Sequence, residues 1–174
     1  MTAPVPDLAG LVHAYGVATD TPAHLAALVG GDVDAVDKAV YHLNSAIIHQ
    51  STPWPATGPA VRYVCERVLD GTLAPSARPG VTRFLAEVAD AIAVATDQGP
   101  EDLEAQRDEL AADHDLAAMT AELAELDEGE AEEEYEAWFE EAEIADLVVI
   151  VGYLDLLDLS DLVTAARQRL DGAS

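Results

Sequence analysis

The sequence has little cysteine, few basic residues and few aromatic side chains. Cys65 is the single cysteine, so no internal disulfide can form, and we expect its thiol to be buried on the apolar face of a helix. The 174 residues contain eight lysines and arginines against 34 aspartates and glutamates, which gives a formal net charge of −26. Nucleic acid and anionic membrane surfaces repel such a chain, whereas basic proteins attract it.

The sequence also lacks a long uncharged hydrophobic segment. Its most apolar stretch, residues 144–159, is too short to span a bilayer and contains Asp146, Asp155 and Asp158. The first 16 residues have neither the basic region nor the long apolar core of a secretory signal. We therefore expect a cytoplasmic protein that binds neither membranes nor nucleic acid.

Residues 20–69 are predicted to form three helices. Thr21-Pro22 is typical of a helix start, Gly30-Gly31 of a helix end, and Asp32 of a second N-cap. The helix after Asp32 has apolar residues at intervals of three and four: Val33, Val36, Val40, Leu43 and Ile47. None of these short helices can bury its apolar face alone, so they must pack on one another.

The rest of the chain is predicted to be helical as well. A short helix is expected over residues 8–15, another over residues 81–96, and a long one over residues 101–126, either continuous or broken near Asp113–Asp115. Leu147–Val151 has strand propensity, but its flanks are helical and a partner strand is missing, so we predict a helix there. A last helix is predicted to start at Ser160.

The first half resembles HEAT repeats. Short helices in antiparallel pairs, joined by Gly-Asp, are typical of such repeats. The second helix carries the cap and the small or branched apolar residues at matching places: Asp32, Ala35, Val36, Ala39, Val40 and Leu43. The run TPAHLAAL…GD…HLNSAIIHQSTPWPAT is similar to small HEAT-type proteins of actinobacteria. The resemblance covers roughly residues 20–70. It implies a helical solenoid that holds a partner, and it brings no catalytic residue with it.

We therefore predict one all-α domain over residues 1–174, built as a HEAT-like solenoid of antiparallel helical pairs. Residues 1–98 form the HEAT-like pairs, and residues 99–174 form an acidic helical half. Residues 127–134, DEGEAEEE, are expected to be a solvated turn or a disordered bridge because their carboxylates repel one another.

The acidic residues are concentrated in one segment of the second half. Residues 122–146 contain 13 carboxylates, and neither lysine nor arginine occurs between Arg107 and Arg167. Such a run either keeps the protein soluble or forms a docking surface for a basic partner. An aromatic pair, Trp138-Phe139, lies within it, and we expect one ring to be buried and the other half-exposed. Trp54, between two prolines, either covers the helix ends or anchors an interface.

The predicted function is a non-enzymatic interaction module whose acidic surface binds a basic protein. Its most concrete forms are an immunity-like inhibitor that neutralises a toxin and a mimic in which carboxylates replace the phosphates of a nucleic acid. The candidate partner-binding residues are Glu130, Glu132, Glu133, Glu134, Glu136, Trp138, Glu140, Glu141 and Trp54. We assign no catalytic, cofactor-binding or metal-binding residue.

Two alternatives remain open. The first is a hydrolase or metal-dependent module that uses His42 and His49, which share a helix face, or Asp113–Asp115. The sequence offers that alternative little support, because it contains no HExxH, no glycine-rich phosphate loop and no paired cysteine ligands. The second is a passive helical scaffold whose acidity serves solubility alone.

Overall fold

Capping residues determine where the first helices begin. The computed structural model describes residues 4–172. Helix α1 (Thr21–Ala27) starts at Thr21 with Pro22 in its first turn, so its N-cap is Asp20, one residue earlier than predicted. Helix α2 (Val33–His42) starts after Asp32, whose carboxylate accepts a hydrogen bond from the Ala35 N–H at 2.8 Å. That side-chain cap confirms the prediction at Asp32.

The described residues are mostly helical, as predicted, and contain nine α-helices. Two two-stranded hairpins accompany them, β1 (Val12–His13) with β2 (Gly16–Val17) and β3 (Ile48–His49) with β4 (Thr52–Pro53). The other helices are α3 (Thr57–Leu69), α4 (Arg78–Gln98), α5 (Pro100–Ala111), α6 (Leu116–Glu125), α7 (Glu128–Trp138), α8 (Ala142–Leu157) and α9 (Ser160–Asp171). A π-helical turn, Leu43–Ile47, extends α2, and a 3-10 turn, Pro75–Ala77, precedes α4.

The hairpins are a correction to the all-α prediction. The expected helix over residues 8–15 is wrong, because Val12–His13 pairs with Gly16–Val17 in an antiparallel hairpin. Gly16 has a φ of +124°, a conformation that glycine adopts far more easily than other residues. In the second hairpin, Gln50 and Ser51 both have positive φ, as a two-residue type I′ turn requires.

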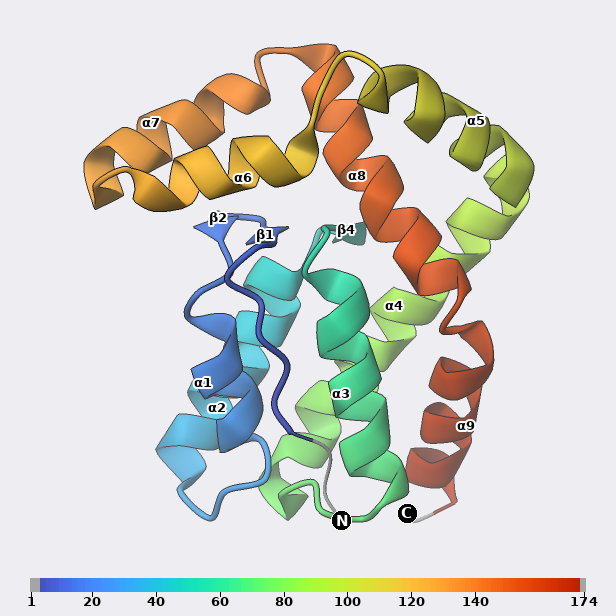
Figure 1. Ribbon diagram of the computed structural model, residues 1–174. Helices are drawn as coiled ribbons and strands as arrows, with labels where there is room; N and C mark the ends of the chain where they lie inside the picture. The colour runs from blue at the N-terminus through green and yellow to red at the C-terminus, as the bar shows by residue number, and fades with distance from the viewer. Residues whose placement is uncertain (1–3, 173–174) are drawn as a thin grey trace.

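The main core lies among α1, α2, α3, α4 and α9 (Figure 1). Phe84 and Leu85 of α4 are among its fully buried side chains, and Cys65 of α3 is buried with them, as predicted. Helix α9 comes from the end of the chain and packs on both α3 and α4. The first and last parts of the sequence therefore share one apolar core.

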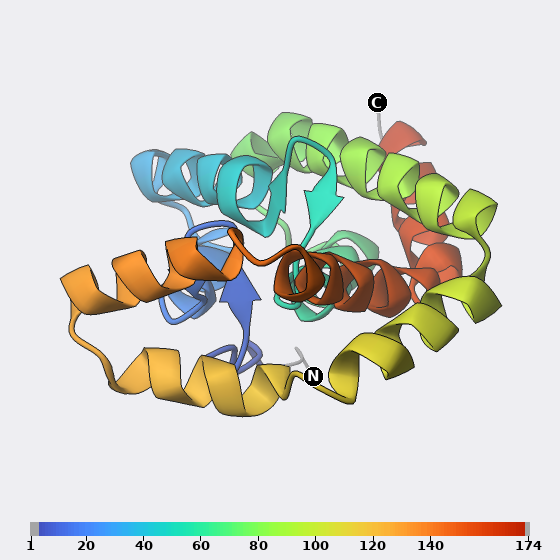
Figure 2. The ribbon, with the colours of Figure 1, turned by 90° about the horizontal axis from the view of Figure 1, so that it is seen from above.

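The second half adds two pairs of packed helices, α5 with α8 and α6 with α7. Helices α5 and α8 pack on each other and on α4. The expected break at Asp113–Asp115 separates α5 from α6, and Leu147–Val151 lies within α8, which confirms the helical prediction. Helices α6 and α7 run antiparallel over the β1–β2 hairpin (Figures 1 and 2). Within residues 4–172, no helix combines the length and apolar character needed to cross a membrane.

The predicted turn or disordered bridge at residues 127–134 is wrong, because helix α7 begins at Glu128. Asp127 caps this helix by accepting a hydrogen bond from the Glu130 N–H at 3.1 Å. Tyr135 and Trp138 are buried one turn apart and hold α7 against the rest of the molecule. The cap and these two rings offset the repulsion among the glutamates.

Candidate functional site

A cleft of about 1160 Å³ separates the helical hairpin α6–α7 from the face formed by β1–β2, α1 and α2. Figure 1 shows α6 and α7 lying across the end of this face, above the β1–β2 hairpin. The cleft therefore joins the acidic segment of the second half to the first helical pair.

One wall of the cleft carries a row of glutamates. Glu128, Glu132 and Glu136 all line it, and their spacing of four residues places them on one face of α7. All three side chains are exposed to solvent. Repulsion between like charges at this spacing destabilises a helix by about 0.2–0.5 kcal/mol per pair. The row therefore costs stability in the absence of a counter-charge.

The opposite wall carries exposed tyrosines. Tyr15, at the tip of the β1–β2 turn, and Tyr41, on α2, are 62% and 75% exposed. Asp37 and Lys38 of α2 also line this wall. Large aromatic side chains exposed around a concave surface are a common feature of binding sites.

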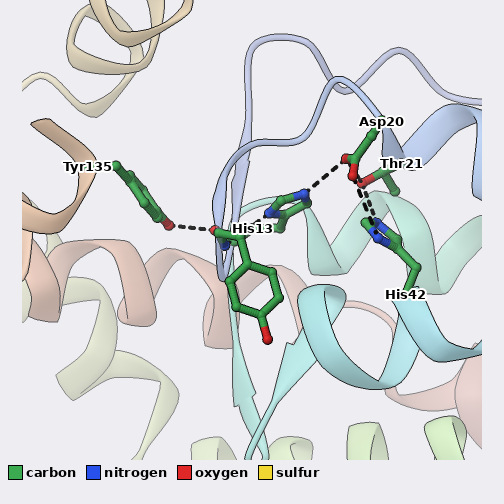
Figure 3. A network of polar contacts seen from close by, with 6 residues as sticks. His13, Asp20, Thr21, His42 and Tyr135 are labelled. Atoms are coloured by element: carbon green, nitrogen blue, oxygen red, sulfur yellow. Dashed lines mark hydrogen bonds and ion pairs between the residues drawn. The ribbon is translucent and has the colours of Figure 1, made fainter. Parts of the chain in front are cut away.

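A polar network connects His13, Asp20, Thr21 and His42 (Figure 3). His13 Nε2 is 3.0 Å from Asp20 Oδ1, and His42 Nε2 is 2.9 Å from the Thr21 hydroxyl. His42 Nδ1 lies 3.8 Å from Asp20 Oδ2, which is too long for a hydrogen bond. Both histidines are buried, whereas the Asp20 side chain is 55% exposed and faces the cleft.

The surroundings of this network determine its charge. Burial lowers the pKa of His42 to about 4, although the Asp20 carboxylate acts in the opposite direction. Partial burial raises the pKa of Asp20, but the hydrogen bond from His13 and the attraction of His13 and His42 together outweigh it, so the net pKa lies below the ordinary value. At neutral pH the network therefore contains a neutral His42 and an ionised Asp20.

Two local features hold the histidines in place. The backbone N–H of Tyr15 donates to His13 Nδ1 at 3.1 Å, so the ring proton is on Nε2 and points at Asp20. His42 lies at the junction of α2 with the π-helical turn, and its ring stacks on His24 with centroids 4.2 Å apart. Single π-helical turns occur frequently at functional sites.

The π-helical turn also connects the two hairpins. Its Ala46 carbonyl accepts a hydrogen bond from the Ala14 N–H at 3.0 Å, and its Ile47 carbonyl accepts one from the Thr57 hydroxyl. Both carbonyls are thus bonded to groups outside the turn. The Ala14–Ala46 bond fixes the β1–β2 hairpin, and therefore His13 and Tyr15, relative to His42, whereas the Thr57–Ile47 bond ties the turn to α3.

The partner-binding glutamates predicted from the sequence divide into two groups. Glu132 and Glu136 line the cleft, whereas Glu130, Glu133 and Glu134 are exposed on other faces of α7. Glu140 and Glu141 are exposed in the connection between α7 and α8. Glu128, which the sequence did not single out, completes the row that lines the cleft.

Both predicted tryptophans are buried within this chain. Trp54 is 8% exposed and Trp138 is 3% exposed, and they belong to one apolar cluster that also contains Tyr135. Phe139 is 38% exposed and packs edge-on against Trp54, which confirms the prediction of one buried and one half-exposed ring at positions 138 and 139. The tryptophans attach α7 and α8 to the first half.

The structure does not bring together the residues of either alternative site, His42 with His49 or Asp113–Asp115. His49 lies away from the His13–Asp20–His42 network, where its Nδ1 is 2.9 Å from the Ser45 carbonyl. Asp113–Asp115 does not form a common site, because Asp115 caps α6 at the Ala118 N–H and His114 lies 3.4 Å from Glu143. The sequence analysis included His42 in an alternative site, but no pattern predicted that His42 would lie beside His13 and Asp20.

Comparisons with known proteins give no further assignment. No protein-family model matches the chain, and no match was found among curated proteins or solved structures.

Proposed function

We propose that this protein is a non-enzymatic interaction module that binds a basic segment of a partner protein in the cleft between α7 and the α1–α2 face. The observation that carries the proposal is the row Glu128, Glu132 and Glu136 opposite the exposed rings of Tyr15 and Tyr41. Carboxylates and aromatic faces are the two groups that bind lysine and arginine side chains.

Charge complementarity favours a cationic occupant. The lining residues include five carboxylates and one lysine, Lys38, and the chain as a whole carries a net charge of −26. A bound basic segment relieves the repulsion along α7, so the stability lost to the glutamate row is recovered in the complex. Long-range attraction also speeds the encounter, and salt weakens it.

The tyrosines supply the apolar part of the same site. A guanidinium or ammonium group over a tyrosine ring contributes about 0.5–1 kcal/mol at an exposed position. Tyr15 and Tyr41 are exposed in the free chain, so such contacts require no rearrangement of the core. An inhibitor that neutralises a basic toxin, or one that replaces nucleic-acid phosphates with carboxylates, would use this surface.

A HEAT-like origin for the first helical pair belongs to the proposal as well. Its support is the packing of α1 on α2 across the Gly31-Asp32 connection. The packing of α9 on α3 and α4 departs from a solenoid, in which each repeat contacts only its neighbours. We therefore limit the HEAT-like description to the pair α1–α2.

The test compares two triple variants with equal charge changes. Glu128, Glu132 and Glu136 are changed to Gln in the cleft variant, and Glu130, Glu133 and Glu134 are changed to Gln in the control. The probe is a short arginine- and lysine-rich peptide, titrated by calorimetry into the full chain. We expect the cleft variant to bind at least about tenfold more weakly and the control less than about threefold more weakly.

The salt dependence adds a second criterion. Affinity of the native chain should fall steeply between about 0.05 and 0.5 M salt, and less steeply for the cleft variant. Equal losses in both triple variants would reject the cleft as the site and leave a diffuse electrostatic attraction. Failure of the native chain to bind the peptide at low salt would favour the passive scaffold.

A further inference from the structure

We propose that His13, Asp20 and His42 form a binding site for a divalent transition-metal ion such as Zn²⁺ at the floor of the cleft. Each residue offers one ligand atom, and these atoms all lie within 4.8 Å of one another. The site goes beyond the proposed recognition of a basic segment, because it uses residues of β1, the N-cap of α1 and α2, and none of the glutamates of α7.

The distances are close to those that a metal ion requires. Four tetrahedral ligands at about 2.0–2.1 Å from Zn²⁺ lie about 3.4 Å from one another. The closest approaches here are 3.0 Å between His13 Nε2 and Asp20 Oδ1 and 3.8 Å between His42 Nδ1 and Asp20 Oδ2. The three ligand atoms lie within 4.8 Å of one another, so side-chain rotations that draw them together by up to about 1.4 Å bring them to bonding positions.

The chemistry of the donors selects the kind of ion. Two imidazoles and one carboxylate suit Zn²⁺ and related first-row ions, whereas Ca²⁺ and Mg²⁺ prefer sites made of oxygen atoms alone. The glutamates of α7 offer carboxylates without an imidazole, so they distinguish poorly between cations. Selectivity for Zn²⁺ over Ca²⁺ therefore distinguishes binding at the His13–Asp20–His42 site from binding to the glutamates of α7.

His42 is oriented for this role by Thr21. The Thr21 hydroxyl donates to Asp20 Oδ1 at 3.4 Å, and its oxygen accepts from His42 Nε2 at 2.9 Å. This hydrogen bond leaves the lone pair of Nδ1 facing Asp20 Oδ2 at 3.8 Å. Two electron-rich atoms thus face each other at a separation that a cation can bridge. Hydrogen bonds of this kind to the outer nitrogen orient metal-binding histidines in general.

His13 must change tautomer when the ion binds. In the metal-free chain its proton is on Nε2, because Nδ1 accepts from the Tyr15 N–H. Coordination through Nε2 moves the proton to Nδ1, so the Tyr15 N–H must turn away from the ring. Tyr15 lies at an exposed hairpin tip, where water can take over that hydrogen bond. A change at the Tyr15 amide is therefore a signature of binding at this site.

The site is open to the cleft. The Asp20 side chain is 55% exposed, whereas the two histidines are 4% and 7% exposed. Buried imidazoles provide a rigid base, and the remaining coordination positions face the solvent-filled cleft. Ligand exchange at the ion is thus possible without unfolding.

The test is titration of the metal-free full chain with Zn²⁺ by calorimetry, with Ca²⁺ as the competing cation. We expect one Zn²⁺ per chain, retained in excess Ca²⁺. Asp20→Asn and His13→Gln should each weaken Zn²⁺ binding at least about tenfold. His49→Asn and the triple variant Glu128→Gln, Glu132→Gln, Glu136→Gln are the matched controls, and neither should weaken it more than about threefold.

A second measurement uses only the native chain, so its result does not depend on whether the variants fold. In the native chain, Co²⁺ should give the visible absorption of a low-coordinate site with nitrogen ligands, and Zn²⁺ should shift the amide resonance of Tyr15. Displacement of Zn²⁺ by Ca²⁺, an equal loss in the glutamate triple, or an unmoved Tyr15 amide would overturn the proposal. The peptide titration is made with metal-free protein, so its failure and the failure of this proposal are distinguishable.

Discussion

The Tyr135 hydroxyl of α7 donates a hydrogen bond to the backbone carbonyl of His13, at 2.5 Å, across 122 residues of sequence. Tyr135 is buried, and burial raises the pKa of its phenol, so the group remains a donor at all ordinary pH values. This contact connects the acidic helix to the strand that carries His13. It fixes the distance between the two walls of the cleft.

Replacement of Tyr135 by Phe should destabilise the fold by about 1 kcal/mol, the net value of a typical internal hydrogen bond. The ring remains and keeps its packing on Trp138, so the loss in the free energy of unfolding measures the contribution of the hydrogen bond. Urea unfolding measures the change. Tyr41→Phe, at an exposed position, is the control and should change stability by less than about 0.5 kcal/mol. An equal effect of both variants would show that Tyr135 does not attach α7 to β1.

Gly152 allows α8 to approach β4 closely. A Cβ at this position would lie 2.7 Å from the Pro53 carbonyl carbon and 2.8 Å from the Trp54 nitrogen, both backbone atoms. Gly152→Ala should therefore destabilise the protein by about 1–3 kcal/mol, as overpacking usually does. The measurement is again urea unfolding.

Gly129 in α7 provides the matched control. A Cβ added at Gly129 would have an Asp127 carboxylate oxygen as its nearest neighbour, at 3.7 Å, which is an ordinary van der Waals distance. Gly129→Ala should stabilise the protein by up to about 1 kcal/mol, because alanine is the better helix former. If Gly152→Ala were neutral or stabilising as well, the close packing of α8 on β4 would be refuted.

Cys65 should be unreactive in the native protein. The side chain is fully buried, and burial raises the pKa of the thiol to about 12, so the thiolate is scarce at pH 8. A thiol reagent should modify one group per chain in denaturant and none in the native state on the same timescale. Rapid labelling without denaturant would show that α3 is accessible from solvent.

The same pKa shift predicts a loss of stability in alkali. The folded-state pKa lies above the ordinary value of 9.0, so the unfolded chain releases the thiol proton first. The contribution is fully present below pH 9 and is lost as the pH rises from about 9 towards 12. Comparison of the pH dependence of unfolding between the native chain and Cys65→Ala isolates this contribution; identical slopes would contradict the shift.

Helical periodicity predicted most of the fold because long apolar faces determine most of it. Spacing correctly predicted the buried residues Val36, Leu43 and Ile47, but Val33 of the same predicted face is 57% exposed. The helical identity of Leu147–Val151 was predicted correctly from its flanks. The hairpins were missed because two-residue strands contain too few residues to show a period. Helix α7 was missed because charge repulsion is visible in the sequence, whereas the burial of Tyr135 and Trp138 is a tertiary effect.

The candidate site was only partly predictable for the same reason. The glutamate row was visible as a charge run, although spacing alone did not show which members share the cleft. His13 and Asp20 are seven residues apart, but His42 follows 22 residues after Asp20, and the three meet only when the β1–β2 hairpin folds onto α2. Glu128, Glu132 and Glu136 follow one another at intervals of four, so they share one face of any helix that contains them. The sequence could have shown this shared face, but it could not show that the face lines a cleft.

The most direct measurement is to map a bound arginine- and lysine-rich peptide on the isotope-labelled chain by amide chemical shifts at low salt. We predict that the largest shifts occur at Tyr15, Tyr41, Glu132 and Glu136, on both walls of the cleft. Shifts concentrated instead on the exposed acids of α5, such as Glu104 and Asp108, would contradict the assignment of the cleft as the binding site.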